Sequence, residues 1–228
     1  GLFGWIRKLP WGDPSFTAQN LAMILFAFGG IGGLTNASYN LNLAIHNTMW
    51  VPGHFHLTVG SATTLSFFGI AYWLVPKLAN KPLFSPKMAL WQAWTWFVGM
   101  ILMSNGLHVI GLNFSVPRRT MLGVAPYAQS TWQPQLIEAA IGGSILGISG
   151  LLFYGVMLGT ILRKKTLEEP IEMPVAEPYH PEEKIPAWLD TWRPWIVVTV
   201  LLILVAYGPI LVDMLTNIQL TSPGFKVW

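Results

Sequence analysis

Five long apolar runs constrain the fold of this chain more than any other feature. They cover about residues 16–35, 55–75, 88–112, 136–162 and 195–215. Each run is close to the length of about 20 residues that an α-helix needs to cross about 30 Å of hydrocarbon. Because no water is available there, the backbone polar groups of such a run must pair within a helix. The sequence therefore predicts an all-α fold, a polytopic bundle of about five transmembrane helices.

The composition supports a membrane protein and excludes several other classes. Hydrophobic residues make up 53% of the 228 residues and charged residues only 10%, whereas a soluble domain averages about 25% charged residues. The net charge of +3 comes from scattered basic residues that form no stripe, so membrane lipid and not nucleic acid is the expected surrounding. Cysteine is absent, which excludes disulfides, thiolate metal sites and cysteine nucleophiles.

The runs and the segments between them suggest five parts. Residues 1–15 form an interfacial lead-in, and residues 16–163 hold four transmembrane helices. Residues 164–193 are an acidic, Pro-rich loop, residues 194–217 hold the fifth helix, and residues 218–228 are a tail. The stretch Asp13-Pro14-Ser15 is typical of a helix start. The chain opens with Gly1 instead of Met, and we expect it to be a piece of a longer polypeptide or a processed half.

The distribution of basic residues predicts the orientation in the membrane. With five crossings, ten basic residues fall on one side: Arg7, Lys8, Lys77, Lys81, Lys87, Arg163, Lys164, Lys165, Lys184 and Arg193. Three fall on the other side: Arg118, Arg119 and Lys226. Because cytoplasmic loops carry the excess of Lys and Arg, we expect the side with ten to face the cytoplasm.

One histidine-rich stretch, His46 to Leu57 (HNTMWVPGHFHL), contains three of the five histidines. Pro52 and Gly53 suit a turn ahead of a helix over 54–75, so His54 and His56 should lie in or beside its first turn. Residues two apart on a helix differ by about 200° around its axis. The two imidazoles therefore cannot chelate one metal ion, but each can hold a different metal, as the axial ligand of a planar cofactor such as haem. The alternative is a capping or hydrogen-bonded core histidine.

The same stretch resembles the helix of haem–copper oxygen reductase subunit I that carries a His-x-His pair. Its sequence is most similar to that of the B-type branch, the cytochrome ba-type oxidases. The resemblance implies that His54 binds a high-spin, A-type haem at the oxygen site. It also implies that His56 binds a low-spin haem, expected to be haem b, with Phe55 packed between the two macrocycles.

An arginine pair, Arg118-Arg119, follows the third run on the same side as the histidine stretch. Two adjacent guanidiniums indicate anionic partners, because Arg binds carboxylates through a bidentate fork. Lipid headgroups are one choice. The resemblance implies haem propionates instead, and it places His46 and Asn47 beside them. His108, on the third run, is interpreted as a lone histidine with a hydrogen-bonded packing role.

The resemblance implies the C-terminal part of the catalytic subunit of a terminal respiratory oxidase in the cell membrane. Electrons would pass from the low-spin to the high-spin haem and on to dioxygen, coupled to proton pumping. Copper and the second axial histidine of the low-spin haem are expected from the upstream half of subunit I. Further expected partners are a subunit II with a copper centre and a soluble cytochrome c or quinol. The alternatives are a nitric oxide reductase-like relative and a non-enzymatic transporter with Gly-broken helices.

Overall fold

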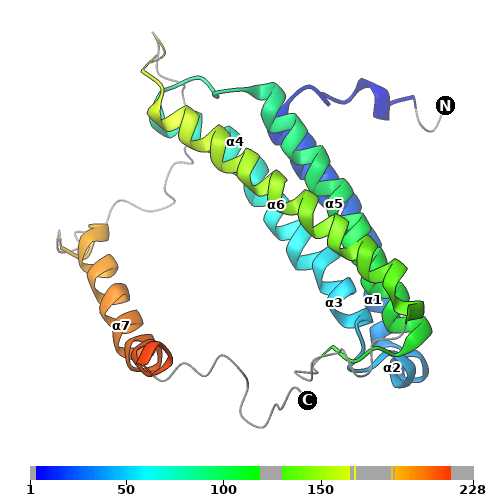
Figure 1. The fold of residues 1–228 in the computed structure, drawn as a ribbon. Helices are drawn as coiled ribbons and strands as arrows, with labels where there is room; N and C mark the ends of the chain where they lie inside the picture. Colours follow the sequence, from blue (N-terminus) through cyan, green and yellow to red (C-terminus); the bar gives the residue numbers. More distant parts are fainter. Residues whose placement is uncertain (1–3, 119–129, 165–166, 168–185, 187, 217–228) are drawn as a thin grey trace. The chain divides into compact units, whose positions relative to one another are not determined.

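The computed structural model describes residues 4–118, 130–164, 167, 186 and 188–216 (Figure 1). The arginine Arg119, most of the acidic loop and the C-terminal tail lie outside these residues. The described elements are η1 (Ile6–Lys8), α1 (Pro14–Ala37), α2 (Tyr39–Ile45), α3 (Trp50–Phe55), η2 (His56–Thr63), α4 (Thr64–Ala79), α5 (Pro86–Phe114), η3 (Ser130–Trp132), α6 (Gln133–Leu162) and α7 (Trp192–Thr216). The all-α prediction is confirmed.

Five helical spans in the described part are long and apolar enough to cross a membrane. They are Pro14–Ala37, Trp50–Ala79, Pro86–Phe114, Ser130–Leu162 and Trp192–Asp213. The second span joins α3, η2 and α4 into one continuous helix of 30 residues. The number and positions of these spans confirm the interpretation of the apolar runs as membrane-crossing helices.

Helix starts follow the local signals in the sequence. Asp13 caps α1 by accepting a hydrogen bond of 2.6 Å from the Phe16 backbone N–H, and Pro14 occupies the first helical position. Ser85 caps α5 in the same way, accepting a bond of 3.2 Å from the Met88 backbone N–H. These caps satisfy N–H groups that have no partner inside the helix, which explains why both helices begin there.

The histidine-bearing helix begins at Trp50, earlier than the predicted start at residue 54, and it ends at Ala79. Pro52 does not break it, because Pro52 lies in the first turn, where a backbone N–H needs no partner within the helix. His54 and His56 consequently lie beyond the first turn, inside a helix that continues to α4 on their C-terminal side.

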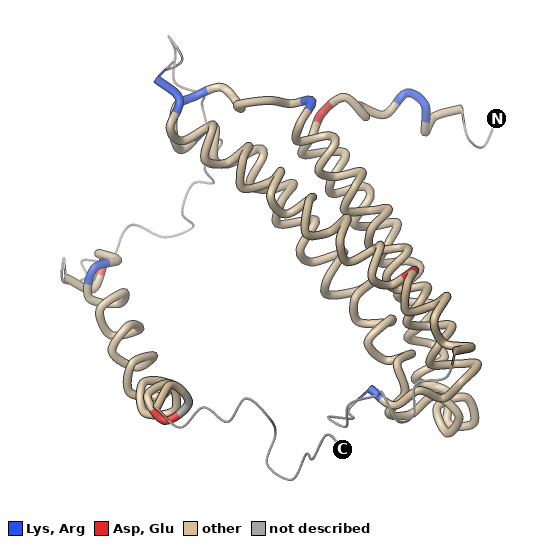
Figure 2. The backbone as a smooth tube through the Cα atoms, viewed as in Figure 1, with Lys and Arg blue, Asp and Glu red and all other residues tan. Residues whose placement is uncertain are grey.

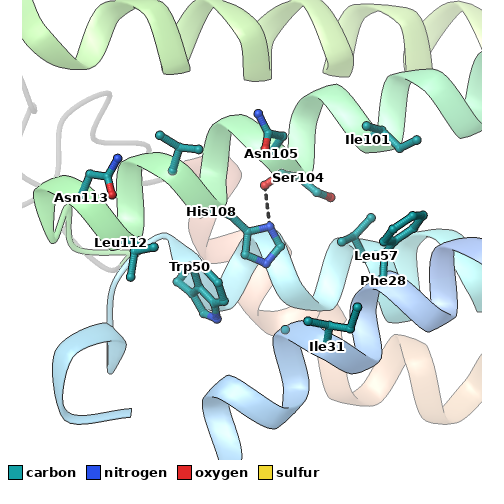
Figure 3. A pocket seen from close by; sticks show the side chains of 12 residues that line it. Phe28, Ile31, Trp50, Leu57, Ile101, Ser104, Asn105, His108, Leu112 and Asn113 are labelled. Carbon is teal, nitrogen blue, oxygen red and sulfur yellow. Dashed lines mark hydrogen bonds between the residues drawn. The ribbon is translucent and has the colours of Figure 1, made fainter. Parts of the chain in front are cut away.

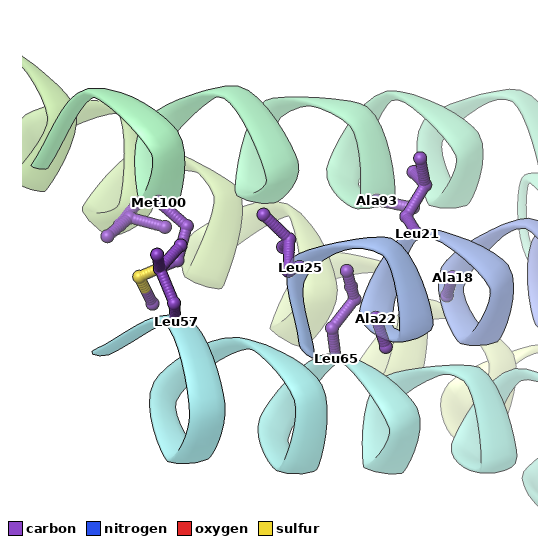
Figure 4. Close-up of a cluster of buried hydrophobic side chains, with 9 residues drawn as sticks. Ala18, Leu21, Ala22, Leu25, Leu57, Leu65, Ala93 and Met100 are labelled. Atoms are coloured by element: carbon purple, nitrogen blue, oxygen red, sulfur yellow. The ribbon is translucent and has the colours of Figure 1, made fainter. Parts of the chain in front are cut away.

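The chain divides into two compact units, residues 1–173 and 174–228, and each is described by itself. In the first unit α1, α4, α5 and α6 run alongside one another (Figure 1). Their shared core is one apolar cluster (Figure 4) formed by Ala18, Leu21, Ala22, Leu25, Leu57, Leu65, Ala93, Met100 and Leu146. The alanines in this cluster let the helices approach closely, as is usual where membrane helices pack.

Helices α5 and α6 make the most extensive contact between two helices in this unit. A Cβ added to Gly106 would stand 2.5 Å from the Gln135 carbonyl oxygen, and one added to Gly142 would collide with the Met103 backbone N. Since real Cβ atoms do not approach this closely, only glycine fits at either position. The two backbones are therefore in direct contact along a glycine seam, which we define by Gly106 and Gly142.

A buried polar network crosses the same pair of helices and reaches α4. The Tyr72 hydroxyl donates to Gln92 Oε1 at 2.8 Å, and Gln92 Nε2 donates to Ser149 Oγ at 3.2 Å. Ser149 Oγ in turn donates to the Gln92 carbonyl oxygen at 2.7 Å. Every member is at most 4% exposed. Such paired polar groups hold membrane helices in register, because the alternative is an unsatisfied group in an apolar surrounding.

In Figure 2 the Lys and Arg segments of the first unit lie toward its ends, whereas one Asp or Glu segment lies along the helices. Arg118 follows the C-terminal end of α5, whereas Lys81 precedes the N-terminal end of α5, and Arg163 and Lys164 follow α6. This agrees with the alternation on which the predicted orientation rests, while the side that faces the cytoplasm stays a prediction. Helix α7, taken by itself, has no buried residue in its apolar span, which is typical of a span that packs on lipid or on other helices.

Candidate functional site

The histidine-bearing helix changes its winding at His56. Residues His56–Thr63 form a π-helix, η2, between the α-helical α3 and α4. The Ser61 hydroxyl donates to the His56 carbonyl oxygen at 2.8 Å, which is the five-residue spacing of a π turn. Short π segments are rare and are found frequently at functional sites, because they re-aim side chains without ending the helix. This one begins at one of the two histidines singled out in the sequence.

His54 lies against α1. Its Nδ1 is 2.9 Å from the carbonyl oxygen of Gly29. A Cβ on Gly32 would stand 3.3 Å from His54 Nδ1, and one on Gly33 would stand 3.2 Å from His54 Cε1. The glycines of α1 therefore make room for this imidazole and supply its hydrogen-bond acceptor.

His56 has a different set of neighbours. Its Nδ1 is 2.6 Å from the Pro52 carbonyl oxygen, one turn earlier on the same helix. Its ring stacks on Phe55 with a centroid distance of 4.8 Å and an interplanar angle of 28°. Phe55 itself is 42% exposed. A Cβ on Gly60 would stand 3.6 Å from His56 Cδ2. The two imidazoles thus have different surroundings, one against α1 and the other along its own helix.

Both histidines share one chemical feature. A carbonyl oxygen can only accept a hydrogen bond, so in the neutral form of each ring the Nδ1 atom carries the proton and Nε2 keeps its lone pair. Neither Nε2 takes part in a hydrogen bond within the described residues. Metal-ligating histidines show this arrangement: the second nitrogen donates to a carbonyl, which fixes the tautomer and the ring orientation. Each of His54 and His56 is therefore prepared to offer Nε2 to a metal ion such as haem iron.

Backbone hydrogen bonds connect the segment just before the histidine-bearing helix to the segment that follows α5. Arg118 donates its backbone N–H to the Asn47 carbonyl oxygen at 2.9 Å, and Met49 donates to the Val116 carbonyl at 2.8 Å. Asn47 has a φ of 60°, a left-handed conformation that Asn tolerates better than most residues. These bonds place Arg118 and Asn47, which are far apart in sequence, side by side.

The Arg118 side chain is only partly paired. Its Nη2 donates to Asn47 Oδ1 at 3.5 Å, and its Nε is buried without a hydrogen-bond partner in the described part. A buried guanidinium nitrogen without a partner fits an anionic group that binds at this end of the helices. His46 is exposed, and its backbone N–H bonds the Asn42 carbonyl at 2.8 Å. Arg119 lies outside the described residues.

His108 stands next to the site, a position that sequence reasoning missed. The prediction that it is hydrogen-bonded is confirmed, since its Nδ1 is 2.8 Å from the Ser104 carbonyl oxygen. The description of it as a lone histidine is wrong, because a Cβ on Gly32 would stand 3.3 Å from His54 Nδ1 and 3.4 Å from His108 Nε2. Its ring also packs edge-on against Trp50, with a centroid distance of 4.5 Å. The one sequence signal was its place ten residues before Arg118, on the same side as the histidine stretch.

No group of three or more His, Cys, Asp or Glu side chains that could hold a metal ion is found among the residues that the structure describes. The donors that this part of the chain offers are thus the single imidazoles described above, each paired with a backbone carbonyl. Single imidazoles suit a cofactor whose iron is already held by a macrocycle and needs only an axial ligand.

Comparison with known proteins decides the family. The family described as cytochrome c and quinol oxidase polypeptide I matches residues 1–145. The chain belongs to this family. It is 39% identical over 234 aligned residues to cytochrome c oxidase subunit 1 of Thermus thermophilus, an alignment that covers 100% of this chain and 41% of that protein. It is 28% identical to cytochrome bo(3) ubiquinol oxidase subunit 1 of Buchnera aphidicola, covering 73% of this chain and 25% of that one.

Comparison with solved structures supports the same family. A haem–copper terminal oxidase dimer matches with a TM-score of 0.64 and 32% identity, covering 86% of this chain and 34% of that chain. The chain spans about two fifths of the length of the Thermus subunit that it matches. As a member of the oxidase polypeptide I family with five apolar spans, it is a multi-pass membrane protein.

Proposed function

We propose that this chain is the C-terminal part of the catalytic subunit of a terminal respiratory oxidase, in which His54 and His56 are the axial ligands of two haems. The observation that supports this most directly is the pairing of both Nδ1 atoms with backbone carbonyls, at 2.9 and 2.6 Å. This pairing leaves both Nε2 atoms as metal donors. The oxidase relatives and the family to which the chain belongs support the same function.

The two histidines are proposed to hold different haems. His54 would ligate a high-spin, A-type haem at the oxygen site, and His56 a low-spin haem, haem b. Their separate surroundings support this division, because one imidazole lies against α1 and the other against Phe55 on its own helix. When bound, the haems would supply electron transfer to dioxygen at a haem–copper centre, coupled to proton pumping.

The protein groups at the end of the bundle marked by Arg118 are proposed to hold the haem propionates. Arg118 and Arg119 would pair with these carboxylates, and Asn47 and His46 would flank them. The unpaired Nε of Arg118 supports this proposal for the residue that the structure describes. The bonds between Arg118 and Asn47 would keep the guanidinium at a constant position relative to the histidine helix.

Other parts of the active enzyme are proposed to come from outside this chain. Copper and the second axial histidine of the low-spin haem would be supplied by the upstream half of subunit I, in the same or a separate polypeptide. A subunit II with a copper centre would pass electrons from a soluble cytochrome c or a quinol. The named relatives include both a cytochrome c oxidase and a ubiquinol oxidase, so both donor classes occur in the family.

The test is to replace each histidine in the complete oxidase. His54→Ala should abolish the carbon monoxide-binding, high-spin component of the reduced-minus-oxidised spectrum and leave the low-spin bands. His56→Ala should remove the low-spin bands instead. The control is Val59→Ala, an exposed position on the same helix that is 60% exposed and should keep both components. Retention of both haem signals and normal turnover in either histidine variant would overturn the assignment.

A further inference from the structure

Two hollows of the first unit have different surroundings. The larger one, of about 510 Å³, has Trp50 and His108 in its wall (Figure 3). Gly32 also lines it and lies against the ring of His54, so this hollow adjoins a proposed haem ligand. The smaller one, of about 350 Å³, lies over the first turns of α5, at the opposite end of that helix from Arg118. It is lined by Lys87, Leu90, Trp91 and Trp94.

The side chains of Lys87, Trp91 and Trp94 belong to one face of α5, because residues three and four apart are neighbours on a helix surface. Trp91 is 69% exposed and Trp94 42% exposed, whereas Ala89 and Ala93 in the same turns are fully buried. Helix α5 thus turns small residues toward its neighbours, as membrane helices usually do where they pack together. The face with Lys87, Leu90, Trp91 and Trp94, which we call the aromatic face, lacks these small residues and points away from the described helices.

The length of α5 places the aromatic face near the membrane surface. The helix has 29 residues, which at about 1.5 Å per residue gives a length of about 43 Å. The hydrocarbon layer is only about 30 Å thick, so the end turns of α5 extend into the headgroup layer. Lys87, in the first turn, then lies at the depth of the headgroups, and Trp91 and Trp94 follow at the boundary with the acyl chains, where Trp is enriched.

The polar groups of the aromatic face are free to bind a ligand. Lys87 Nζ makes no hydrogen bond or ion pair with another described residue, and the indole N–H groups of Trp91 and Trp94 donate to none of them. An ammonium group and an indole N–H can only donate. They therefore fit a ligand that offers acceptor oxygens, such as a phosphate with neighbouring ester carbonyls. Leu90 and the indole rings fit an apolar chain.

Trp94 is held in place by the segment that precedes α1. The centroids of the Trp94 and Trp11 rings are 6.0 Å apart, at an interplanar angle of 37°. Trp11 Nε1 donates to the Ile6 carbonyl oxygen at 2.7 Å, and the Thr17 hydroxyl donates to the Trp11 carbonyl oxygen at 2.8 Å. These contacts connect η1 and α1 to the wall of the hollow. A wall that is already ordered loses little conformational freedom when a ligand binds.

The charges at this end of the first unit favour an anionic ligand. The described part of the unit contains two acids, Asp13 and Glu138. Asp13 caps α1, and Glu138 accepts a hydrogen bond from Asn105, well away from the first turns of α5. The described basic residues on the predicted membrane side of Lys87 are Arg7, Lys8, Lys77, Lys81, Arg163 and Lys164. Basic residues next to membrane helices attract anionic lipids.

We propose that the aromatic face binds one phospholipid with an anionic headgroup. The lipid phosphate accepts hydrogen bonds from Lys87 and from an indole N–H, and one acyl chain lies along Leu90, Trp91 and Trp94. The proposal is independent of the proposed function, because none of these residues is a proposed haem ligand or propionate partner.

The first test is a high-resolution map of the complete, haem-loaded oxidase in a bilayer disc of phosphatidylglycerol and phosphatidylcholine. We expect density for one phospholipid, with its phosphate within hydrogen-bond distance of Lys87 Nζ and a chain along Trp91. A protein segment of the remaining oxidase on this face, or a face without ordered lipid, would overturn the proposal and leave the haem assignments untouched.

The second test measures lipid binding to the purified, complete oxidase by native mass spectrometry, with intact haem bands as the check of assembly. Trp91→Ala removes part of the wall, so the wild type should retain one more phosphatidylglycerol molecule than this variant. Lys87→Gln removes the cation and should weaken the binding of that molecule about fivefold, the attraction of one basic residue to an anionic lipid surface. Its effect on phosphatidylcholine should be much smaller. Unchanged phosphatidylglycerol binding in Lys87→Gln would overturn the proposal.

The matched controls are Lys77→Gln and Trp73→Ala. Lys77 Nζ lies 4.5 Å from the centroid of the Trp73 ring, so α4 carries the same residue types on the same predicted membrane side, but neither residue lines the hollow. Both controls should bind phosphatidylglycerol as the wild type does. If they lower its binding as much as the variants of the aromatic face, the site is not specific and the proposal fails. Should Trp91→Ala fail to assemble, Lys87→Gln and the map decide.

Discussion

The seam between α5 and α6 and the region around His54 both contain glycines in close contacts, but these glycines have different roles in the two regions. At the seam, glycines bring two backbones into contact, and the Tyr72–Gln92–Ser149 network across it is fully paired among side chains and backbone. Around His54, glycines of α1 face an imidazole ring, and several nitrogens have no partner in the described part. The polar groups at the seam are paired within this chain, whereas several polar groups around His54 have no partner among the described residues.

This difference indicates which residues of the first unit stabilise the bundle and which can bind a ligand. Closed polar networks and backbone contacts between helices stabilise a membrane bundle. Open nitrogens with a fixed tautomer bind ligands. Substitutions at the seam should therefore change stability without changing the spectrum of the bound haems, and substitutions around His54 should mainly change the spectrum, with a small effect on stability.

The largest effect is expected for Gly142→Leu at the seam. Even a Cβ at this position collides with the Met103 backbone, so a leucine must separate α5 from α6. Overpacking of this kind costs typically 1–3 kcal/mol and more where the backbone must move, and we expect little or no assembled oxidase. The yield of purified, haem-containing enzyme measures this loss of assembly.

Gly147→Leu is the matched control for the seam. An added Cβ there meets nothing within 4 Å, so assembly should be close to that of the wild type. Equal yields for Gly142→Leu and Gly147→Leu would contradict the role of the glycine seam.

A smaller effect on stability is expected for Gln92→Leu. The change leaves the Tyr72 hydroxyl without its acceptor and removes a donor to Ser149, and such buried unpaired groups cost about 1–3 kcal/mol. The melting temperature of the assembled oxidase should fall while its haem spectrum stays the same. Replacing all three members together, with Tyr72→Phe and Ser149→Ala, should restore much of the loss, because no polar group then remains unpaired. A triple variant less stable than Gln92→Leu would contradict this account.

At His54 the expected effect is mainly spectral. Gly33→Ala adds a methyl group 3.2 Å from His54 Cε1, which is tight enough to move the ring by a few tenths of an ångström. Stability should fall by less than about 1 kcal/mol, in line with volume changes that neighbouring side chains can absorb. The visible and electron paramagnetic resonance signals of the high-spin haem should shift. Gly30→Ala, with nothing within 4 Å of the added Cβ, should leave these signals unchanged. Unshifted signals in Gly33→Ala would contradict the assignment of His54 as the ligand of the high-spin haem.

The smallest effect on assembly is expected for Arg118→Ala. Removing a cation near a haem propionate stabilises the oxidised haem, so its midpoint potential should fall, with a sign that follows from Coulomb attraction. Redox titration of the assembled enzyme measures the change. Lys87→Ala, a substitution in the first turn of α5, at the opposite end of that helix from Arg118, should leave the midpoint potential unchanged. An unchanged midpoint in Arg118→Ala would favour a lipid headgroup as the partner of this guanidinium.

Several features could be predicted from the sequence because they depend on neighbouring residues. The five membrane spans follow from the length of the apolar runs, and the start of α1 follows from Asp13 and Pro14. The placement of His54 and His56 on one membrane helix follows from their position beside an apolar run. The start of that helix at Trp50 was missed, because Pro52 was interpreted as part of a turn, although a first helical turn tolerates it.

Only the tertiary structure decided which groups meet. Gly29 and His54 are 25 residues apart, and His108 reaches Trp50 from another helix. Nothing in the local pattern of α5 distinguishes His108 from a histidine that faces lipid. The partner of each ring nitrogen is set by how the helices cross and rotate about their axes, and the π turn of η2 contributes to that rotation. The sequence alone therefore determined the spans and the two histidines, and the packing of α1, α3 and α5 determined the surroundings of those histidines, because apolar length is a local property and contact between helices is not.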